Sequence, residues 1–345
     1  MKHITLIALA AIAAIAFACT KEPAPEQTAP EPQEATNDAD IVCIDGALHF
    51  PTSELCFATM DALNSDEELS AFEKAHNFTS IRSFTNVMLD ELIECETPEE
   101  YQTILETCTD YLVEDCDRLM PKITSVGYAS IANTDGIFYV NGIKHTVSGD
   151  KVIIDTPDPV TRAITPLEFD CVVPCEGVSE TRAETKKYTD ERYETKKYKV
   201  FARTNLIRNV VAVEIRGKIE YDTHFTYQLH VSGQKKKALI GWNSYKDRFT
   251  VEAIHLDITL DGKRCTYGDI QDLQKISFTS GSTKDFYKTL PVEHVVHTRI
   301  EALPMPAKFN CVVFRARSGA LKNCGAVTDY NICRPAIMLA MQNCI

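Results

Sequence analysis

Residues 210–231 read VVAVEIRGKIEYDTHFTYQLHV, and the alternation of apolar and polar side chains along them decides the fold class. Because successive side chains of a strand point to opposite faces, a period of two predicts strands that bury one face and leave the other in water. One strand is expected over residues 210–221 and another over 224–231. Residues 252–260 repeat the pattern, and further strands are expected at 237–242, 292–303 and 309–317. Residues 193–345 are therefore predicted to form an antiparallel, β-sandwich-like domain with a cysteine-rich C-terminus.

The segment before these strands has helical periodicity. Helices are expected near residues 53–63, from Ser65, at about 80–94 and from Thr97, where Ser65 and Thr97 each start a capping pattern. After them, the segments 126–131, 137–140 and 143–147 read as strands of consecutive hairpins, joined by the turns 133–136 and 141–142. The predicted fold class is thus α+β, with short N-terminal helices followed by antiparallel β hairpins. Residues 41–154 are assigned to an acidic helical and hairpin domain, and 155–192 to a linker or charged arm.

The charge is unevenly distributed along the chain. Residues 41–120 carry eighteen acidic and three basic residues, whereas the net charge of the whole chain is -13. Two interpretations stay open: the acids form a solvated helical face, or they dock against the more basic second half. The acidic balance disfavours nucleic acid as a partner.

The N-terminus has the form of a lipoprotein signal peptide. Lys2 and His3 precede an apolar run that is shorter than a membrane span and ends in small residues before Cys19. Residues 1–18 are therefore predicted to be removed and Cys19 to carry the lipid, because this start resembles that of bacterial lipoproteins. Residues 19–40 contain no large apolar side chain and are expected to form a disordered tether. The membrane is then a partner through the acyl chains, and the expected location is the bacterial outer membrane, facing the periplasm or the exterior.

Thirteen cysteines include twelve besides Cys19, an even number in a chain that is expected to be exported. Such a count predicts disulfide bonds, with Cys43 and Cys56 as one candidate pair and a group at the C-terminus as another. Zinc is disfavoured because no two cysteines have Cys-x-x-Cys spacing. The disulfide candidates are Cys43, Cys56, Cys95, Cys108, Cys116, Cys171, Cys175, Cys265, Cys311, Cys324, Cys333 and Cys344.

One polar cluster on the predicted strands has residue types that bind metals or transfer protons. Its members should point outward into water: His224, His230, His255 and Asp257. Their spacing gives no reason for them to meet, so no metal site, cofactor or catalytic residue is predicted. The sequence also lacks a Gly-x-Ser-x-Gly elbow, a P-loop and a dinucleotide-binding pattern.

Two segments resemble a known group of proteins. Residues 68–82, ELSAFEKAHNFTSIR, and residues 129–142, ASIANTDGIFYVNG, are similar to a pattern in uncharacterised lipoproteins of Bacteroidota. In that pattern a helix ending in Phe-x-Ser-x-Arg precedes an Asn-x-Asp-Gly hairpin, and an all-β part follows. The resemblance covers about the first half of the mature chain and implies no known activity.

Together these features predict a cell-envelope lipoprotein that acts as a binding or structural module rather than an enzyme. Its ligand is not identified by the sequence, and an envelope protein or a glycan is a candidate partner. The alternative is a secreted hydrolase or metal-dependent enzyme that uses the exposed His/Asp cluster.

Overall fold

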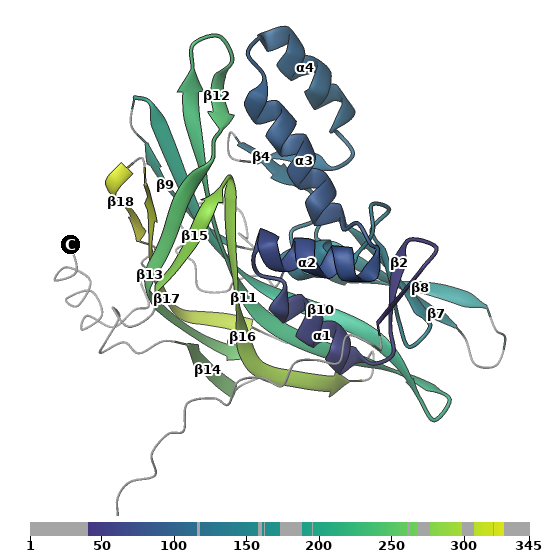
Figure 1. The fold of residues 1–345 in the computed structure, drawn as a ribbon. Helices are drawn as coiled ribbons and strands as arrows, with labels where there is room; N and C mark the ends of the chain where they lie inside the picture. Colours follow the sequence, from purple (N-terminus) through teal and green to yellow (C-terminus); the bar gives the residue numbers. More distant parts are fainter. Residues whose placement is uncertain are drawn as a thin grey trace, which may run out of the picture. The chain divides into compact units, whose positions relative to one another are not determined.

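The N-terminal helices lie where the capping signals predict them. The computed structural model describes residues 41–115, 118–157, 161, 163–172, 188–194, 196–260, 263–267, 277–298, 307–319 and 321–327 (Figure 1). The first four helices are α1 (Ser53–Ala62), α2 (Asp66–His76), α3 (Ile81–Glu94) and α4 (Pro98–Thr107). Ser65 and Thr97 each form a capping box with the glutamate three residues later. These four predicted helices are confirmed.

Residues 126–131, predicted as a strand, instead form the short helix α5 (Val126–Ile131). Ser125 caps it, since its Oγ accepts a hydrogen bond from the backbone N–H of Tyr128 at 3.3 Å. Every residue of α5 is buried. The strand prediction was wrong because a short apolar run that is buried on all sides has the same sequence pattern in a helix and in a strand.

A six-stranded sheet follows the helices. Its strands, in spatial order, are β1 (Val42–Ile44), β2 (Ala47–Phe50), β5 (Ile137–Val140), β6 (Ile143–Ser148), β7 (Lys151–Pro157) and β8 (Ile164–Asp170). The pair β2 and β5 is parallel and the other neighbours are antiparallel. The hairpin predicted at Asn141-Gly142 is confirmed, with positive φ angles of 51° and 76° at these residues. A separate two-stranded ribbon consists of β3 (Leu112–Asp115) and β4 (Arg118–Pro121).

The longest strands, β10 (Tyr198–Ile215) and β11 (Lys218–Lys237), form one antiparallel hairpin (Figure 1). The chain reverses at Arg216-Gly217, where both φ angles are positive at 54° and 74°. The single strand predicted over 210–221 is therefore wrong, because a two-residue turn returns the chain without disturbing the alternation of faces. The same sheet contains β9 (Tyr188–Glu194), β12 (Gly241–Ser244) and β16 (Asp285–Thr298), and β12 and β16 both pair with β11.

The third large sheet is centred on β13 (Asp247–Leu260). It includes β14 (Lys263–Tyr267), β15 (Ser277–Thr283), β17 (Ala307–Ser318) and β18 (Leu321–Val327), and its pairings are antiparallel. One cluster of buried apolar side chains draws on this sheet and on the β10–β11 sheet, including Phe225, Leu229, Phe249, Leu256 and Phe314. The α+β class with several antiparallel sheets is confirmed.

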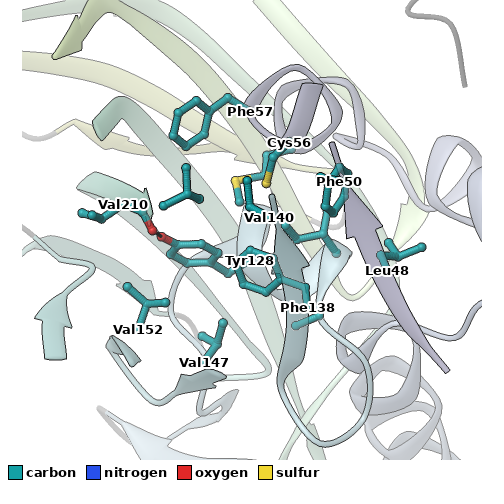
Figure 2. Packing of buried hydrophobic residues seen from close by; sticks show 14 of the residues in the cluster. Leu48, Phe50, Cys56, Phe57, Tyr128, Phe138, Val140, Val147, Val152 and Val210 are labelled. Carbon is teal, nitrogen blue, oxygen red and sulfur yellow. Dashed lines mark hydrogen bonds between the residues drawn. The ribbon is translucent and has the colours of Figure 1, made fainter. Parts of the chain in front are cut away.

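A second core joins the N-terminal half to the start of the long hairpin. Figure 2 shows Tyr128 at its centre, among Phe138, Val140 and Val152, with its hydroxyl at the backbone of Val210. That hydroxyl donates to the Val210 carbonyl at 2.7 Å and accepts from the Val210 N–H at 2.6 Å. Residues on both sides of the predicted 155–192 linker thus contribute to one hydrophobic core.

The polar face of the long hairpin is buried, contrary to the prediction. Between Tyr221 and Gln234 every residue of β11 is buried, although polar and apolar side chains alternate along it. One face contributes to the core shared with the β13 sheet, and the other contacts helices and loops of the N-terminal half. The sequence predicts water on the polar side because alternation cannot distinguish solvent from a polar protein surface.

The cysteines do not form the predicted Cys43–Cys56 disulfide. Both are free thiols, as are Cys95, Cys108 and Cys265. Cys56 is fully buried on α1, where burial raises the pKa of its thiol, and it packs as a small apolar side chain. Cys171 is described too, and its side chain is fully buried in the same core as Cys56. The disulfide candidates Cys116, Cys175, Cys333 and Cys344 lie outside the described residues, as do Cys19, the signal peptide and the tether, and the side chains of Cys311 and Cys324 are not described.

Candidate functional site

The predicted His/Asp cluster is not an exposed site. His224 is 7% exposed, and its Nε2 lies 2.9 Å from Oδ2 of Asp61 on α1. The ring of Phe57, one helical turn before Asp61, lies 5.2 Å from the His224 ring. These contacts attach α1 to the polar face of β11.

His255 and Asp257 lie on β13, in the other sheet, and both are buried. Burial alone would raise the pKa of Asp257, but hydrogen bonds from Arg264 and Asn310 outweigh it and hold that pKa below its usual value. Asp257 thus stabilises a β13–β14 contact. Within the part of the chain that the structure describes, no three His, Cys, Asp or Glu side chains gather closely enough to hold a metal ion.

His230 is the member of the cluster that lies beside open space. It is 2% exposed, its Nε2 lies 2.8 Å from Oδ1 of Asp285, and its ring stacks on Tyr287 with centroids 4.3 Å apart. Tyr287 is its direct neighbour in the β11–β16 register. Asp285 and Tyr287 both line a groove, which places His230 behind its wall.

This groove, of about 430 Å³, lies between the start of α2 and the β15–β16 segment. We call it the α2 groove. Its lining combines carboxylates, hydroxyls, two basic side chains and three aromatic rings: Asn64, Ser65, Asp66, Glu67, Glu68, Arg82, Ser277–Thr283 and Asp285–Lys288. The arrangement suits a polar ligand that forms several hydrogen bonds.

Arg82 fixes the helical wall of the α2 groove. It is 6% exposed, and its guanidinium donates to the carbonyl oxygens of Leu63 and Asn64 at 2.7 and 3.3 Å. It also donates to Ser130 Oγ at 3.1 Å and forms an ion pair with Asp66 at 3.1 Å. One buried cation thereby satisfies the carbonyls that follow α1 and holds the first residue of α2.

The strand wall is attached to the loop after α1 and to α3. The backbone N–H of Thr289 on β16 donates to Asn64 Oδ1 at 3.0 Å. Lys284, which joins β15 to β16, is 5% exposed and its Nζ lies 2.7 Å from Asp90 of α3. Lys246 pairs with the same aspartate at 3.2 Å. Acidic helices therefore dock on basic residues of the second half, one of the two interpretations of the charge pattern.

His230 lines a smaller cavity of about 70 Å³. Arg203, Asn205, Gln228 and Tyr287 also line it. Asn205 is 1% exposed, and its Oδ1 is buried without a hydrogen-bond partner. A polar cavity of this size has room for ordered water that would satisfy such an oxygen.

Sequence reasoning missed the α2 groove because its two walls lie about two hundred residues apart in the chain, for example Arg82 and Tyr287. One available signal was the Phe78-x-Ser80-x-Arg82 stretch, whose arginine proves to be the buried anchor. A second was the charge-free run of β15.

Among the described residues, no helix has both the length and the apolar character needed to cross a bilayer.

Comparisons with known proteins give little further information. No protein-family profile matches the chain, and no curated protein matches it. The chain is similar, at 12% sequence identity, to a crystal structure described as a DUF4848 family protein from Bacteroides thetaiotaomicron VPI-5482. The similarity covers 84% of this chain and 99% of that chain with a TM-score of 0.29, a value at which it carries no argument about fold or function.

Proposed function

We propose that this chain is an outer-membrane lipoprotein of a Bacteroidota type, anchored by acyl chains on Cys19. The support is the apolar N-terminal run with small residues before that cysteine, followed by a tether-like composition up to residue 40. Two or three acyl chains make a durable anchor, because each buried methylene contributes about 0.8 kcal/mol. The folded part then faces the periplasm or the exterior.

The folded part acts as a binding module, and its ligand site is the α2 groove. The observation that supports this is a groove of about 430 Å³ whose two walls are fastened to each other by partly buried polar contacts. A ligand that enters such a preformed groove does not have to order the walls, which lowers the entropic cost of binding. We further propose that the β10–β11 and β13 sheets form a β-sandwich, because one apolar cluster draws on both.

The alternative, a hydrolase or metal-dependent enzyme, depends on an exposed His/Asp cluster. The proposed members of that cluster are buried. His224 on β11 pairs with Asp61, whereas Asp257 lies in the β13 sheet and pairs there with Arg264. A reaction centre needs convergent groups within reach of a substrate. The binding module is therefore the better-supported proposal, with an envelope protein or a glycan as partner.

Site-specific photo-crosslinking in intact cells tests the binding site. A benzophenone amino acid replaces the exposed Ser282 of the groove, and a matched chain carries it at the exposed Thr109, outside the groove. We expect an adduct from position 282, none from 109, and loss of the adduct when Gly281→Lys fills the groove. Equal adducts at both positions, or none at 282, would show that the α2 groove is not the ligand site.

The anchor has its own test. Cys19→Ser should abolish labelling of the chain with radioactive palmitate and its fractionation with membranes. If the variant still labels and still sediments with membranes, Cys19 is not the attachment site.

A further inference from the structure

We propose that the α2 groove binds an extended, basic peptide, which adds to β15 as a new strand. This inference rests on the proposed function of the groove as a ligand site and specifies what occupies it. In strand addition, backbone hydrogen bonds provide affinity and side-chain pockets provide specificity.

The groove is bordered by the backbone edge of β15 and not by one of the two side-chain faces of this strand. All seven residues from Ser277 to Thr283 contribute to the lining. Because alternate side chains of a strand point to opposite faces, an unbroken run of lining residues means that the backbone itself borders the space. Among the described strands, β15 pairs with β13 alone, so its second edge is directed toward the groove. An edge of this kind presents N–H and C=O groups at alternate residues.

Among the described residues, the edge also lacks charge and proline, two common protections against pairing. Proteins commonly guard an exposed edge with charged residues, proline or a covering side chain. The sequence of β15, SFTSGST, has no charge and no proline. On neighbouring β16, by contrast, the N–H of Thr289 is capped by Asn64. The unguarded edge is therefore the one that borders the groove.

The charge of the groove favours a basic peptide. Glu67 is exposed, and its Oε1 lies 3.9 Å from where a Cβ would stand on Gly281 of β15. The other three acids have partners: Asp66 pairs with Arg82, Glu68 accepts the N–H of Ser65, and Asp285 pairs with His230. Glu67 makes no ion pair within the described part of the chain, so it can meet a lysine or arginine of an incoming strand.

A second copy of this chain fits the groove less well. Pairing of β15 with its own copy would be isologous and would bring the acidic first turns of two α2 helices together. With a net charge of -13, two chains also repel each other, whereas a basic partner is attracted.

A saccharide is also less suited, because the ring faces of Phe278 and Tyr287 are occupied and the third ring of the lining, Phe286, packs against the buried apolar cluster. The Nζ of Lys288 lies 4.8 Å from the centre of the Phe278 ring. Tyr287 carries His230 on its ring at 4.3 Å, and the Arg82 guanidinium carbon lies 5.9 Å from its centre. What the groove offers without rearrangement is the strand edge.

Fluorescence anisotropy with the full-length protein in detergent micelles tests this. The probe is a fluorescein-labelled hexapeptide of alternating valine and lysine, and two matched peptides carry glutamate in place of lysine or N-methyl groups on alternate residues. Two variants change the groove: Gly281→Lys, where the backbone is not left-handed and a Cβ meets no atom closer than 3.9 Å, and Glu67→Gln. Glu99→Gln is the control, since Glu99 holds the same second position of a capping-box helix, outside the groove.

We expect the lysine peptide to bind and Gly281→Lys to abolish binding. N-methylation should weaken binding at least about ten-fold, because the alternate backbone donors that would face β15 are lost. Glu67→Gln should weaken binding about three-fold, as for an exposed ion pair, and Glu99→Gln should leave it unchanged. Equal affinity of the N-methylated peptide would overturn strand addition, and equal affinity of the glutamate peptide would overturn the preference for basic ligands.

The remaining outcomes separate this inference from the proposed function. If none of the three peptides binds but position 282 still forms its photo-adduct in cells, the groove is a ligand site and the peptide inference is wrong. A saccharide found in the photo-adduct would likewise show that the groove is a ligand site and that the peptide inference is wrong. A dimer that Gly281→Lys dissociates would identify a second copy as the occupant and overturn the inference. Unfolding midpoints of the variants equal to wild type show that loss of binding is not loss of fold.

Discussion

Acidification should weaken the fold through one buried imidazole, that of His145 on β6. Its side chain is fully buried, and its Nε2 accepts the N–H of Ala212 on β10 at 3.0 Å. Its Nδ1 therefore carries the proton and donates it to the carbonyl of Ile143 at 2.9 Å. Burial lowers the pKa of His145 from 6.5 to about 3.

The sign and size of the effect follow from linkage. Between pH 6.5 and 3 the unfolded chain binds a proton at this site that the folded chain excludes, so this site makes stability fall as the pH falls. From pH 7 to pH 4.5 the loss from a pKa change of this size is about 2.5 kcal/mol. That loss is a large part of the whole free energy of unfolding of an ordinary domain, which is about 5 to 15 kcal/mol.

Comparison with His145→Leu isolates this contribution from the carboxylates that titrate in the same range. The variant leaves the Ala212 N–H unpaired and should be destabilised at pH 7 by about 1 to 3 kcal/mol. Because leucine cannot be protonated, the difference in the free energy of unfolding between variant and wild type should shrink by about 2.5 kcal/mol at pH 4.5. Urea unfolding at both pH values gives the two differences. An unchanged difference would refute the reasoning.

Three further predictions concern the core, the groove and the thiols. Tyr128→Phe should cost about 2 to 4 kcal/mol in the free energy of unfolding, because it leaves both backbone groups of Val210 unpaired; a cost below 1 kcal/mol in urea would contradict this. Arg82→Leu should destabilise by about 3 kcal/mol or more, since two buried acceptors and one partly buried acceptor lose their donor. Arg82→Lys should recover part of this in the same assay. Alkylation in denaturant without reductant, read by mass spectrometry, should label at least the free thiols of Cys43, Cys56, Cys95, Cys108 and Cys265. A missing label on any of these five would mean that its sulfur is bonded.

Local signals in the sequence predicted local structure well. Ser65 and Thr97 mark helix starts because a capping box is completed within four residues. The turn at Asn141-Gly142 is equally local. The failures have another cause. The apolar run 126–131 satisfies both a strand and a buried helix, and the turn at Gly217 is hidden inside an unbroken alternation.

The site depended on contacts that no local pattern contains. Whether His224 faces water or Asp61 is decided by a helix that precedes it by more than 160 residues. The α2 groove is assembled in the same way, from the first turn of α2 and an edge strand about two hundred residues later in the chain. The pairing of Cys56 was predicted wrongly because an even count of cysteines suggests oxidation, whereas the thiol fills core space.

The buried polar face of the long hairpin also constrains the order in which the molecule can assemble. The hairpin β10–β11 is a nearest-neighbour pairing and needs no distant partner to form. The N-terminal core, however, includes Val210–Val213 and Tyr221, so a chain that ends before residue 210 has no complete surface on which to close. The helices, although made first, must therefore wait for strands made later. Folding is then one cooperative event, and a fragment cut within 155–192 should expose both the apolar core of the first half and the polar contacts that hold it to the hairpin.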